Sequence, residues 1–296
     1  MSSASTSVKV ARLEDQLTQF SLQGVDVSLA NALRRVMIAE VPTVAIDLVE
    51  VLENSSVLCD EFLAHRLGLI PLDSTKASEL FKPYEYTGDD ESATDVHLEL
   101  KVRCVGEQTR DVTSEDLVSF DERVKPVSFL AASTGAWKTN AILIAKLRKN
   151  QEISMKCIAR KGTGRDHAKW SPVSTAVFKH EPVVHIEQEI LDTLTGTEKR
   201  VIAESDPSKM FKYDVESDSF VQSSLESCTF DGEMLNKINE LGKTGLIEIR
   251  PSNEHFTFHV ESTGALKVEE IVLQALQILQ TKLDVIGGEL ESLENA

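Results

Sequence analysis

Basic side chains are scarce in this sequence. Its 31 lysines and arginines stand against 48 aspartates and glutamates, which gives the 296 residues a formal net charge of −17. A protein that binds DNA or RNA unaided needs the opposite sign, because neutralisation of phosphates supplies most of the affinity. We therefore expect no direct high-affinity binding of nucleic acid.

Long apolar runs are also missing. Charged residues interrupt each run well before the roughly 20 apolar residues that a membrane-spanning helix needs. Residues 1–7 are small and polar, and they lack the basic and apolar segments of a secretory signal. These absences predict a soluble intracellular protein with no membrane association.

Cysteine is rare and scattered. The four cysteines are Cys59, Cys104, Cys157 and Cys228, and no two of them have the C-x-x-C spacing of a structural zinc site or a redox centre. The spacing indicates small buried apolar residues in a reducing compartment.

What is present is typical of a folded chain of about two domains, at roughly 150 residues per domain. Apolar periodicity predicts several helices, over residues 29–39, 60–69, 186–193, 233–241 and 268–286. Alternating or apolar runs predict strands over 44–52, 96–104, 142–147, 153–159, 173–177, 246–249 and 256–260. The elements mix without the regular alternation of a doubly wound sheet, so the predicted class is α+β.

The last helix carries a wide apolar stripe, which includes Val268, Ile271, Ala275, Leu279 and Leu283. Two interpretations are open. The stripe either covers the core of its own domain, or it completes an interface with another subunit.

The sequence offers no convincing catalytic centre. The glycine-containing segment 160–165 lacks the pattern of a phosphate-binding loop and is predicted to be a basic surface turn joining two strands. Alternatively, its positive side chains bind an acidic partner surface or RNA phosphate. His255 and His259 share one face of a predicted strand, but no third metal ligand is nearby, which favours solvated polar side chains.

Arg34 and Arg35 are adjacent on a strongly apolar helix. They either form its solvated side or present guanidinium groups to the carboxylates of a partner protein.

Four segments, in order along the chain, resemble one family. They read DVSLANALRRVMIAEVPT at 26–43, DEFLAHRLGLIPL at 60–72, RDHAKWSP at 165–172 and FHVESTG at 258–264. They are similar to signatures of the alpha-like subunits of multisubunit DNA-dependent RNA polymerases. The sequence of residues 34–47 is most similar to that of the third-largest subunit of plant-like RNA polymerase II. In plants this subunit also serves RNA-silencing polymerases.

The resemblance implies a discontinuous alpha-like dimerisation domain, residues 1–48 and 176–296, with an inserted, mostly β domain, residues 49–175. It implies a nuclear, non-catalytic assembly subunit that pairs with a smaller alpha-like subunit and docks the second-largest subunit, while the two largest subunits hold the catalytic centre. Small zinc-binding subunits are further expected neighbours. The equivalent subunit of RNA polymerases I and III is the alternative.

The resemblance also assigns residues to contacts. The resemblance assigns docking of the second-largest subunit to Arg34 and Arg35. The expected dimer interface consists of Leu29, Leu33, Met37, Ile271, Leu276, Leu279 and Leu283. The expected contacts of the insert domain with neighbouring subunits are His65, Arg66, Asp166, His167, Lys169 and Trp170.

Two departures from the family pattern concern metals. Polymerase II members often bind zinc through cysteines between the Leu72 signature and the next strand, but no cysteine lies between Leu72 and Val96, so we expect no zinc and no other cofactor. Some relatives hold an iron–sulfur cluster in the region of residues 204–230, where Cys228 alone cannot ligate one. The acidic segment 181–230 is either a mobile excursion or part of another interface.

Overall fold

The computed structural model describes residues 6–130, 139–215, 219–223, 228–230 and 232–294. The chain divides into two compact units. Unit 1 consists of Met1–Lys9, Phe20–Ala30 and Phe178–Phe258, and unit 2 of Val10–Gln19, Asn31–Val177 and His259–Ala296. The boundaries of these units differ from those of the expected dimerisation and insert domains, and the expected boundaries stay a prediction.

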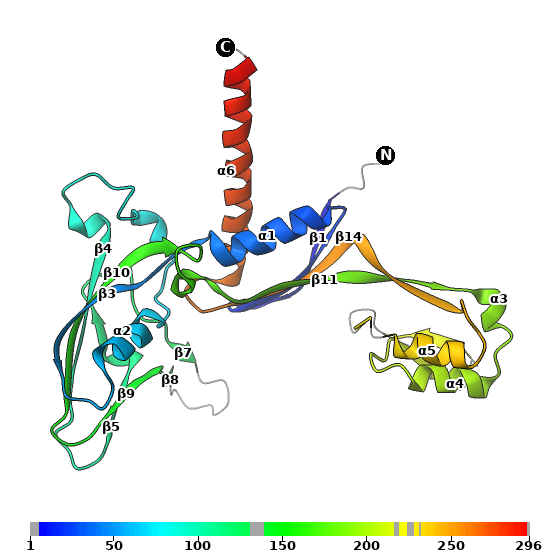
Figure 1. The fold of residues 1–296 in the computed structure, drawn as a ribbon, viewed down its shortest axis with the longest axis horizontal. Coiled ribbons are helices and arrows are strands. Elements are labelled where there is room, and N and C mark those ends of the chain that lie inside the picture. Colours follow the sequence, from blue (N-terminus) through cyan, green and yellow to red (C-terminus); the bar gives the residue numbers. More distant parts are fainter. Residues whose placement is uncertain (1–5, 131–138, 216–218, 224–227, 231, 295–296) are drawn as a thin grey trace. The chain divides into compact units, whose positions relative to one another are not determined.

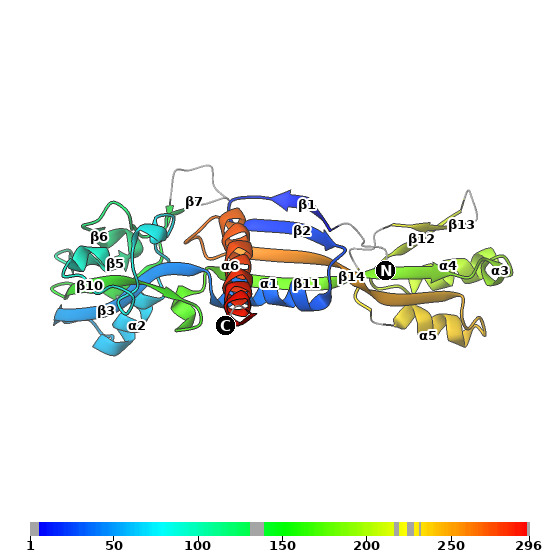
Figure 2. The same ribbon diagram turned by 90° about the horizontal axis from the view of Figure 1, so that it is seen from above.

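One sheet has four strands in the order β1-β2-β14-β11 (Figures 1 and 2). Its strands are β1 (Ser7–Leu13), β2 (Leu17–Gln23), β14 (Ile247–Ser262) and β11 (Val173–Ile186). Burial alternates along β2 and along the second half of β14, where Phe256, Phe258 and Val260 are buried, and the rings of Phe20 and Phe258 stack at 4.9 Å. Helix α1 comprises Val27–Ala39.

Two differences from the predicted elements concern this sheet. The strands β1 and β2 were not predicted. The two predicted strands at 246–249 and 256–260 are one strand, β14, which continues through Pro251. Proline suits the φ of an extended chain and removes only one hydrogen-bond donor, so it does not have to end a strand.

A second antiparallel sheet, in the order β3-β10-β4-β6, lies in unit 2 (Figure 1). Its strands are β3 (Pro42–Asn54), β10 (Glu152–Thr163), β4 (Asp95–Arg103) and β6 (Leu117–Ser119). The predicted alternation in β4 is confirmed, because Leu98 and Leu100 are buried while His97 is exposed. One face of the sheet packs into a core with Leu63 and Leu67 of helix α2 (Asp60–Gly68).

Smaller elements complete unit 2. Two short sheets pair β5 (Arg110–Thr113) with β9 (Leu143–Leu147), and β7 (Phe129–Leu130) with β8 (Thr139–Asn140). The 3-10 turns are η1 (Ala77–Glu79), η2 (Glu91–Ala93), η3 (Ser114–Asp116) and η4 (Ala168–Trp170). The chain ends in helix α6 (Val268–Glu294), which is longer than predicted because it continues through Gly287 and Gly288.

The described part of the acidic segment shares a core in unit 1 with the residues that follow it, and this core includes Ile202, Phe211 and Ile238. The elements of the segment are α3 (Gln188–Leu191), α4 (Gly196–Glu204), β12 (Phe211–Asp214) and β13 (Ser219–Gln222), and α5 (Glu233–Glu240) follows it. The predicted helix at 186–193 is wrong in length, because Ile186 ends β11 and only four residues are helical. These described residues therefore form a folded part of the chain.

Three cysteines are buried, as predicted, and Cys59 is exposed. Cys59 is the N-cap residue of α2, a position at the surface end of the helix, which is why the prediction is wrong there. Burial raises the pKa of the Cys157 thiol to about 12, as expected for an unreactive core residue.

Candidate subunit interface

Helix α6 has one apolar stripe whose two halves differ in exposure. Val268, Ile271 and Ala275 are buried. At roughly 100° per residue the same side of the helix continues beyond Ala275, and there it is open, with exposed side chains at Leu283 (68%), Ile286 (57%), Leu290 (57%) and Leu293 (73%). Leu276 (47%) lies at the edge of this side. Packing within the domain explains only the first half, and the second half has the character of an interface.

The seven expected interface residues divide into two groups. Leu33, Met37 and Ile271 are covered by their own chain, with at most 3% of each exposed. The other four reach the surface, Leu29, Leu276 and Leu283 fully and Leu279 in part. The covered residues hold the helices in place, and only the second group is available for direct contact.

An ion pair connects α6 to the end of α1. Lys282 Nζ lies 2.5 Å from the carboxylate of Glu40, and the two side chains are 49% and 28% exposed. Exposed pairs of this kind contribute about 0–1 kcal/mol. The second half of α6 is therefore oriented by this contact but not held by apolar packing.

The two arginines of α1 have different surroundings. Arg34 is half-buried, and its Nε and Nη2 both donate to Asn31 Oδ1, at 3.1 and 2.9 Å. Arg35 is exposed and forms no ion pair with any residue that the structure describes. Arg35 is thus the freer of the two to bind a carboxylate.

Three of the six expected contact residues of the insert domain meet at one cavity. His65 of α2 and His167 and Lys169 of the turn before β11 line a space of about 270 Å³, together with Asp47 of β3 and Leu69. His65 and His167 are exposed, so the cavity is open to a partner.

The other three point elsewhere. Arg66 Nη2 donates to the carbonyl oxygen of Leu143 at 2.5 Å, and Asp166 accepts a 2.9 Å hydrogen bond from Thr163 Oγ1 that shapes the turn. Trp170 is buried, and its Nε1 donates to the carbonyl oxygen of Arg160 at 2.9 Å.

Charges beside this cavity are paired within the chain. Lys169 Nζ donates to Asp47 Oδ1 at 2.6 Å and lies 4.2 Å from the centre of the Trp170 ring. Arg160 donates from Nε and Nη2 to the two oxygens of Asp95, each at 2.8 Å. These hydrogen bonds hold the pKa of Asp95 below its ordinary value of 3.8, since they stabilise the charged carboxylate.

The glycine-containing segment is not the surface turn that its sequence predicted. Residues 160–163 continue β10. A Cβ on Gly162 would approach the Trp170 ring to 2.5 Å, and one on Gly164 would overlap the carbonyl oxygen of Ile38. Both glycines are needed for close packing, because they let the Trp170 turn approach the end of α1. There Arg165 N donates to the carbonyl oxygen of Ala39 at 2.8 Å.

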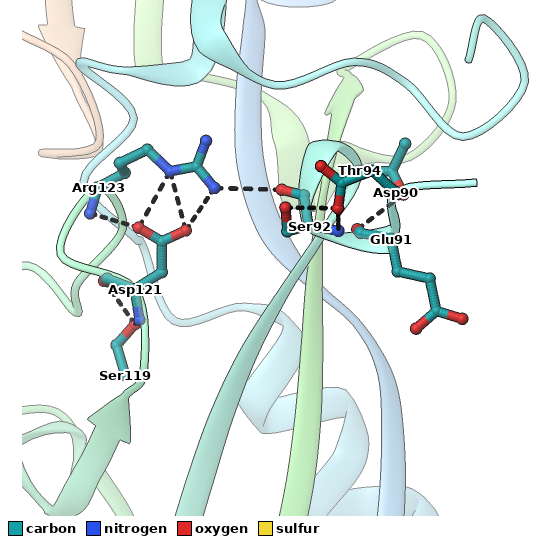
Figure 3. Close-up of polar contacts among 7 residues, drawn as sticks. All are labelled: Asp90, Glu91, Ser92, Thr94, Ser119, Asp121 and Arg123. Atoms are coloured by element: carbon teal, nitrogen blue, oxygen red, sulfur yellow. Dashed lines mark hydrogen bonds and ion pairs between the residues drawn. The ribbon is translucent and has the colours of Figure 1, made fainter. Parts of the chain in front are cut away.

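The loop 73–95 is held together without cysteine. Arg123 Nη2 donates to the carbonyl oxygen of Ser92 at 3.1 Å, and its Nε donates to both oxygens of Asp121, at 3.0 and 2.9 Å (Figure 3). Asp90 Oδ1 accepts from Ser92 N at 3.0 Å, and Phe81 N donates to the carbonyl oxygen of Ala93 at 2.9 Å.

The residues that close this loop do not fit a zinc ion. The loop offers no thiolate, and across the described ranges no group of three or more His, Cys, Asp or Glu residues is placed to hold a metal. His255 and His259 instead lie beside Glu181 and Glu261, at 3.6 and 3.0 Å respectively.

Among the described residues, no helix is both long and apolar enough to span a bilayer.

Sequence comparison identifies the class of protein. The model of the RNA polymerase Rpb3/Rpb11 dimerisation domain matches residues 19–283, and the chain belongs to this family. The match covers both α1 and most of α6, so the resemblance drawn from the four motifs is confirmed, as is the α+β class.

The relatives define its branch. The chain is 47% identical over 285 residues to the DNA-directed RNA polymerases II, IV and V subunit 3 of Arabidopsis thaliana, covering 94% of this chain and 89% of the relative. It is 42% identical over 287 residues to the RNA polymerase II subunit rpb3 of Dictyostelium discoideum, covering 96% and 94%. Identity to the RNA polymerases I and III subunit rpac1 of the same organism is 32% over 296 residues, covering 93% and 79%. The chain is a homologue of subunit 3.

Proposed function

We propose that this chain is a nuclear, non-catalytic assembly subunit of RNA polymerase II or of a plant-type RNA-silencing relative. It pairs with a smaller alpha-like subunit and docks the second-largest subunit, and the two largest subunits hold the catalytic centre. The observation that carries the proposal is the uncovered second half of the α6 stripe, in a chain whose family is defined by a dimerisation domain.

Energetics favour a partner on this stripe. Burying one leucine or isoleucine side chain stabilises a complex by about 1.5–3 kcal/mol, and Leu276, Leu283 and Ile286 are all roughly half exposed or more. The net charge of −17 opposes association of two copies, which favours a different and less acidic chain. In this proposal Leu29, Leu276, Leu279 and Leu283 contact the partner, and Leu33, Met37 and Ile271 support them from beneath.

The test compares Leu283→Glu with Gln277→Glu, an exposed position on the side of α6 away from the stripe. The tagged full chain is co-expressed with the small alpha-like subunit of the same cells, and the retained partner is quantified. We expect Leu283→Glu to lower retention at least about tenfold, while Gln277→Glu retains the partner and both variants keep the wild-type circular dichroism. Wild-type retention by Leu283→Glu, and likewise by Leu276→Glu, would overturn the assignment.

The arginines of α1 are proposed to dock the second-largest subunit. We expect Arg35→Glu and Arg34→Glu to fold, to keep the small alpha-like partner and to lose the second-largest subunit. Arg35→Glu should act more directly, because Arg34 also binds Asn31. Normal recruitment by both variants would refute this role.

The cavity beside α2 is proposed to face another subunit, with the small zinc-binding subunits as the expected neighbours. His65 and His167 are exposed there, while Lys169 is engaged with Asp47. The double variant His65→Ala/His167→Ala should lose one such neighbour from the purified complex, and an unchanged subunit composition would contradict the proposal.

An equivalent role in RNA polymerases I and III is the alternative, since the chain is also 32% identical to a subunit of those enzymes. The higher identities, 47% and 42%, favour the polymerase II branch. Purification of the tagged chain from its native cells and identification of the largest co-purifying chains distinguishes the two.

A further inference from the structure

The outer face of the sheet β3-β10-β4-β6 carries an apolar row that the described residues leave uncovered. Ile158 of β10 is in register with Leu48 of β3 on one side and His97 of β4 on the other. Phe120 follows β6, and its backbone N donates to the carbonyl oxygen of His97 at 3.1 Å. Side chains alternate along each strand, so these four residues share the face opposite the buried Leu98 and Cys157.

This row is more exposed than packing within the sheet requires. Phe120 is 68% exposed and Leu48 is 46% exposed, and Val118 beside them is 58% exposed. Leu48, Ile158, His97 and Phe120 line an open depression of about 630 Å³. Single exposed apolar residues are ordinary, but a contiguous group around a depression marks a binding surface.

The neighbouring row sets the charge of this face. Lys156 is in register with Glu50 on one side and Glu99 on the other, and Glu99 is in register with Val118. One lysine between two glutamates leaves one negative charge beside the apolar row. A second copy of the chain would bring the same glutamates together, on molecules that each carry a charge of −17. A basic partner is favoured.

We propose that this face docks one segment of a neighbouring polymerase subunit. The face consists of Leu48, Ile158, His97, Phe120, Val118, Glu50, Lys156 and Glu99. The segment places an aromatic or branched apolar side chain over Ile158, between Leu48 and Phe120, and a lysine or arginine against Glu50 and Glu99. The inference rests on the proposed assembly function and adds a second contact surface, on a different sheet from α1 and α6.

Site-specific photo-crosslinking tests where the face docks. p-Benzoylphenylalanine replaces Phe120 in the tagged full chain, and the assembled complex is purified from native cells and irradiated. Val105, which is 75% exposed in the same unit and does not line the depression, is the control position. We expect position 120 to crosslink to another subunit, at a peptide with a basic residue next to apolar ones. A crosslink to the same chain, to a second copy or to an acidic peptide, or no crosslink at position 120, overturns the proposal.

A retention experiment tests the energetics. Phe120→Asp should lower the amount of the crosslinked subunit at least about tenfold, and Val105→Asp should leave it unchanged. The double variant Glu50→Gln/Glu99→Gln should weaken retention and reduce its dependence on salt. The small alpha-like partner is measured in the same preparations. If that partner is absent from the wild-type complex, the proposed function fails; if it is present and Phe120→Asp changes nothing, only this inference fails.

Discussion

At the scale of single residues, two glycines allow the Trp170 turn to pack closely against the end of α1. Gly162 faces the indole ring of Trp170, and Gly164 faces the carbonyl oxygen of Ile38 at the end of α1. Thr43 Oγ1 adds a buried hydrogen bond to the carbonyl oxygen of Trp170 at 2.8 Å. A glycine-containing segment that its sequence predicted to be a basic surface turn is thus a packing motif, which only the neighbouring backbone reveals.

We expect Gly164→Ala to destabilise the chain by about 1–3 kcal/mol, because the added methyl group overlaps a backbone oxygen that has no rotamer to move. Gly288→Ala is the matched control. A Cβ there meets nothing within 4 Å, and alanine in a helix is favoured over glycine by about 0.5–1 kcal/mol. Urea unfolding measures both variants, and equal effects would contradict the packing role of Gly164.

The Asp95–Arg160 pair predicts a pH dependence. The folded-state pKa of Asp95 is lowered, mainly by hydrogen bonds from Arg160, so the pair stabilises the fold fully above the ordinary aspartate value of 3.8. This stabilisation is lost as the pH falls through the lowered folded-state pKa.

Asp95→Asn should therefore be less stable than the wild type at neutral pH, and the difference should shrink in acid. Thermal unfolding from about pH 7 to pH 2.5 measures it. Asp111→Asn removes a pair with Lys146 in which both side chains are more than half exposed, and is the control. A difference for Asp95→Asn that stays constant with pH would rule out this origin.

At the scale of elements, the loop 73–95 shows how a segment without metal ligands is fixed. Asp73 N donates to the carbonyl oxygen of Lys125 at 2.8 Å, and Arg123 reaches Ser92 at the other end of the loop. The hydrogen bonds from Arg123 also keep the pKa of Asp121 below its ordinary value. The segment 121–126 thus joins both ends of the loop.

We expect Arg123→Ala to speed amide hydrogen exchange in residues 81–94 at least about tenfold, which corresponds to roughly 1.4 kcal/mol of lost local stability. Arg103→Ala is the control, since Arg103 is 62% exposed and lies 3.7 Å from Glu152. A chelator should leave exchange in the wild-type loop unchanged. Faster exchange on chelation would show that a metal closes the loop.

Elements with strong periodicity were predicted, and several others were missed. Helices α1 and α2 and strand β4 fall close to their predicted positions. Strand β1 was missed because it is an edge strand exposed on all seven residues, which gives no inward-facing pattern. Strand β2 was missed although Phe20 and Leu22 alternate with polar residues and are buried. Helix α4 was missed despite its capping box, in which Thr195 N donates to Glu198 at 2.8 Å.

The candidate interface was predictable in its elements but not in its individual residues. The stripe of α6 is visible in the sequence. Which of its residues are covered depends on how far the rest of the chain extends along the helix, and Ala275 is the last buried residue. For the same reason Leu33 and Met37, on a helix correctly predicted, are interior.

At the scale of the whole molecule, the net charge opposes self-association of the chain and the α6 stripe favours it. A net charge of −17 keeps copies of the isolated chain apart, and salt screens that repulsion over a Debye length of roughly 8–10 Å near physiological ionic strength. The exposed leucines attract each other at any salt concentration.

We expect the isolated chain to remain monomeric at low salt and to self-associate increasingly as salt is raised, as measured by sedimentation velocity. Deletion of residues 284–294 removes Ile286, Leu290 and Leu293 and should weaken this association. It should change the free energy of unfolding by less than about 1 kcal/mol, because all buried α6 residues lie at or before Ala275. Undiminished self-association of the shortened chain at high salt would contradict a role of this part of the stripe.

The bare second half of α6 has a consequence for how much of this protein a cell keeps. Under the proposed pairing, a copy without its partner exposes leucines that chaperones and proteases recognise, and assembly buries them. We then expect surplus copies to be removed, so that the abundance of the chain follows the supply of the partner.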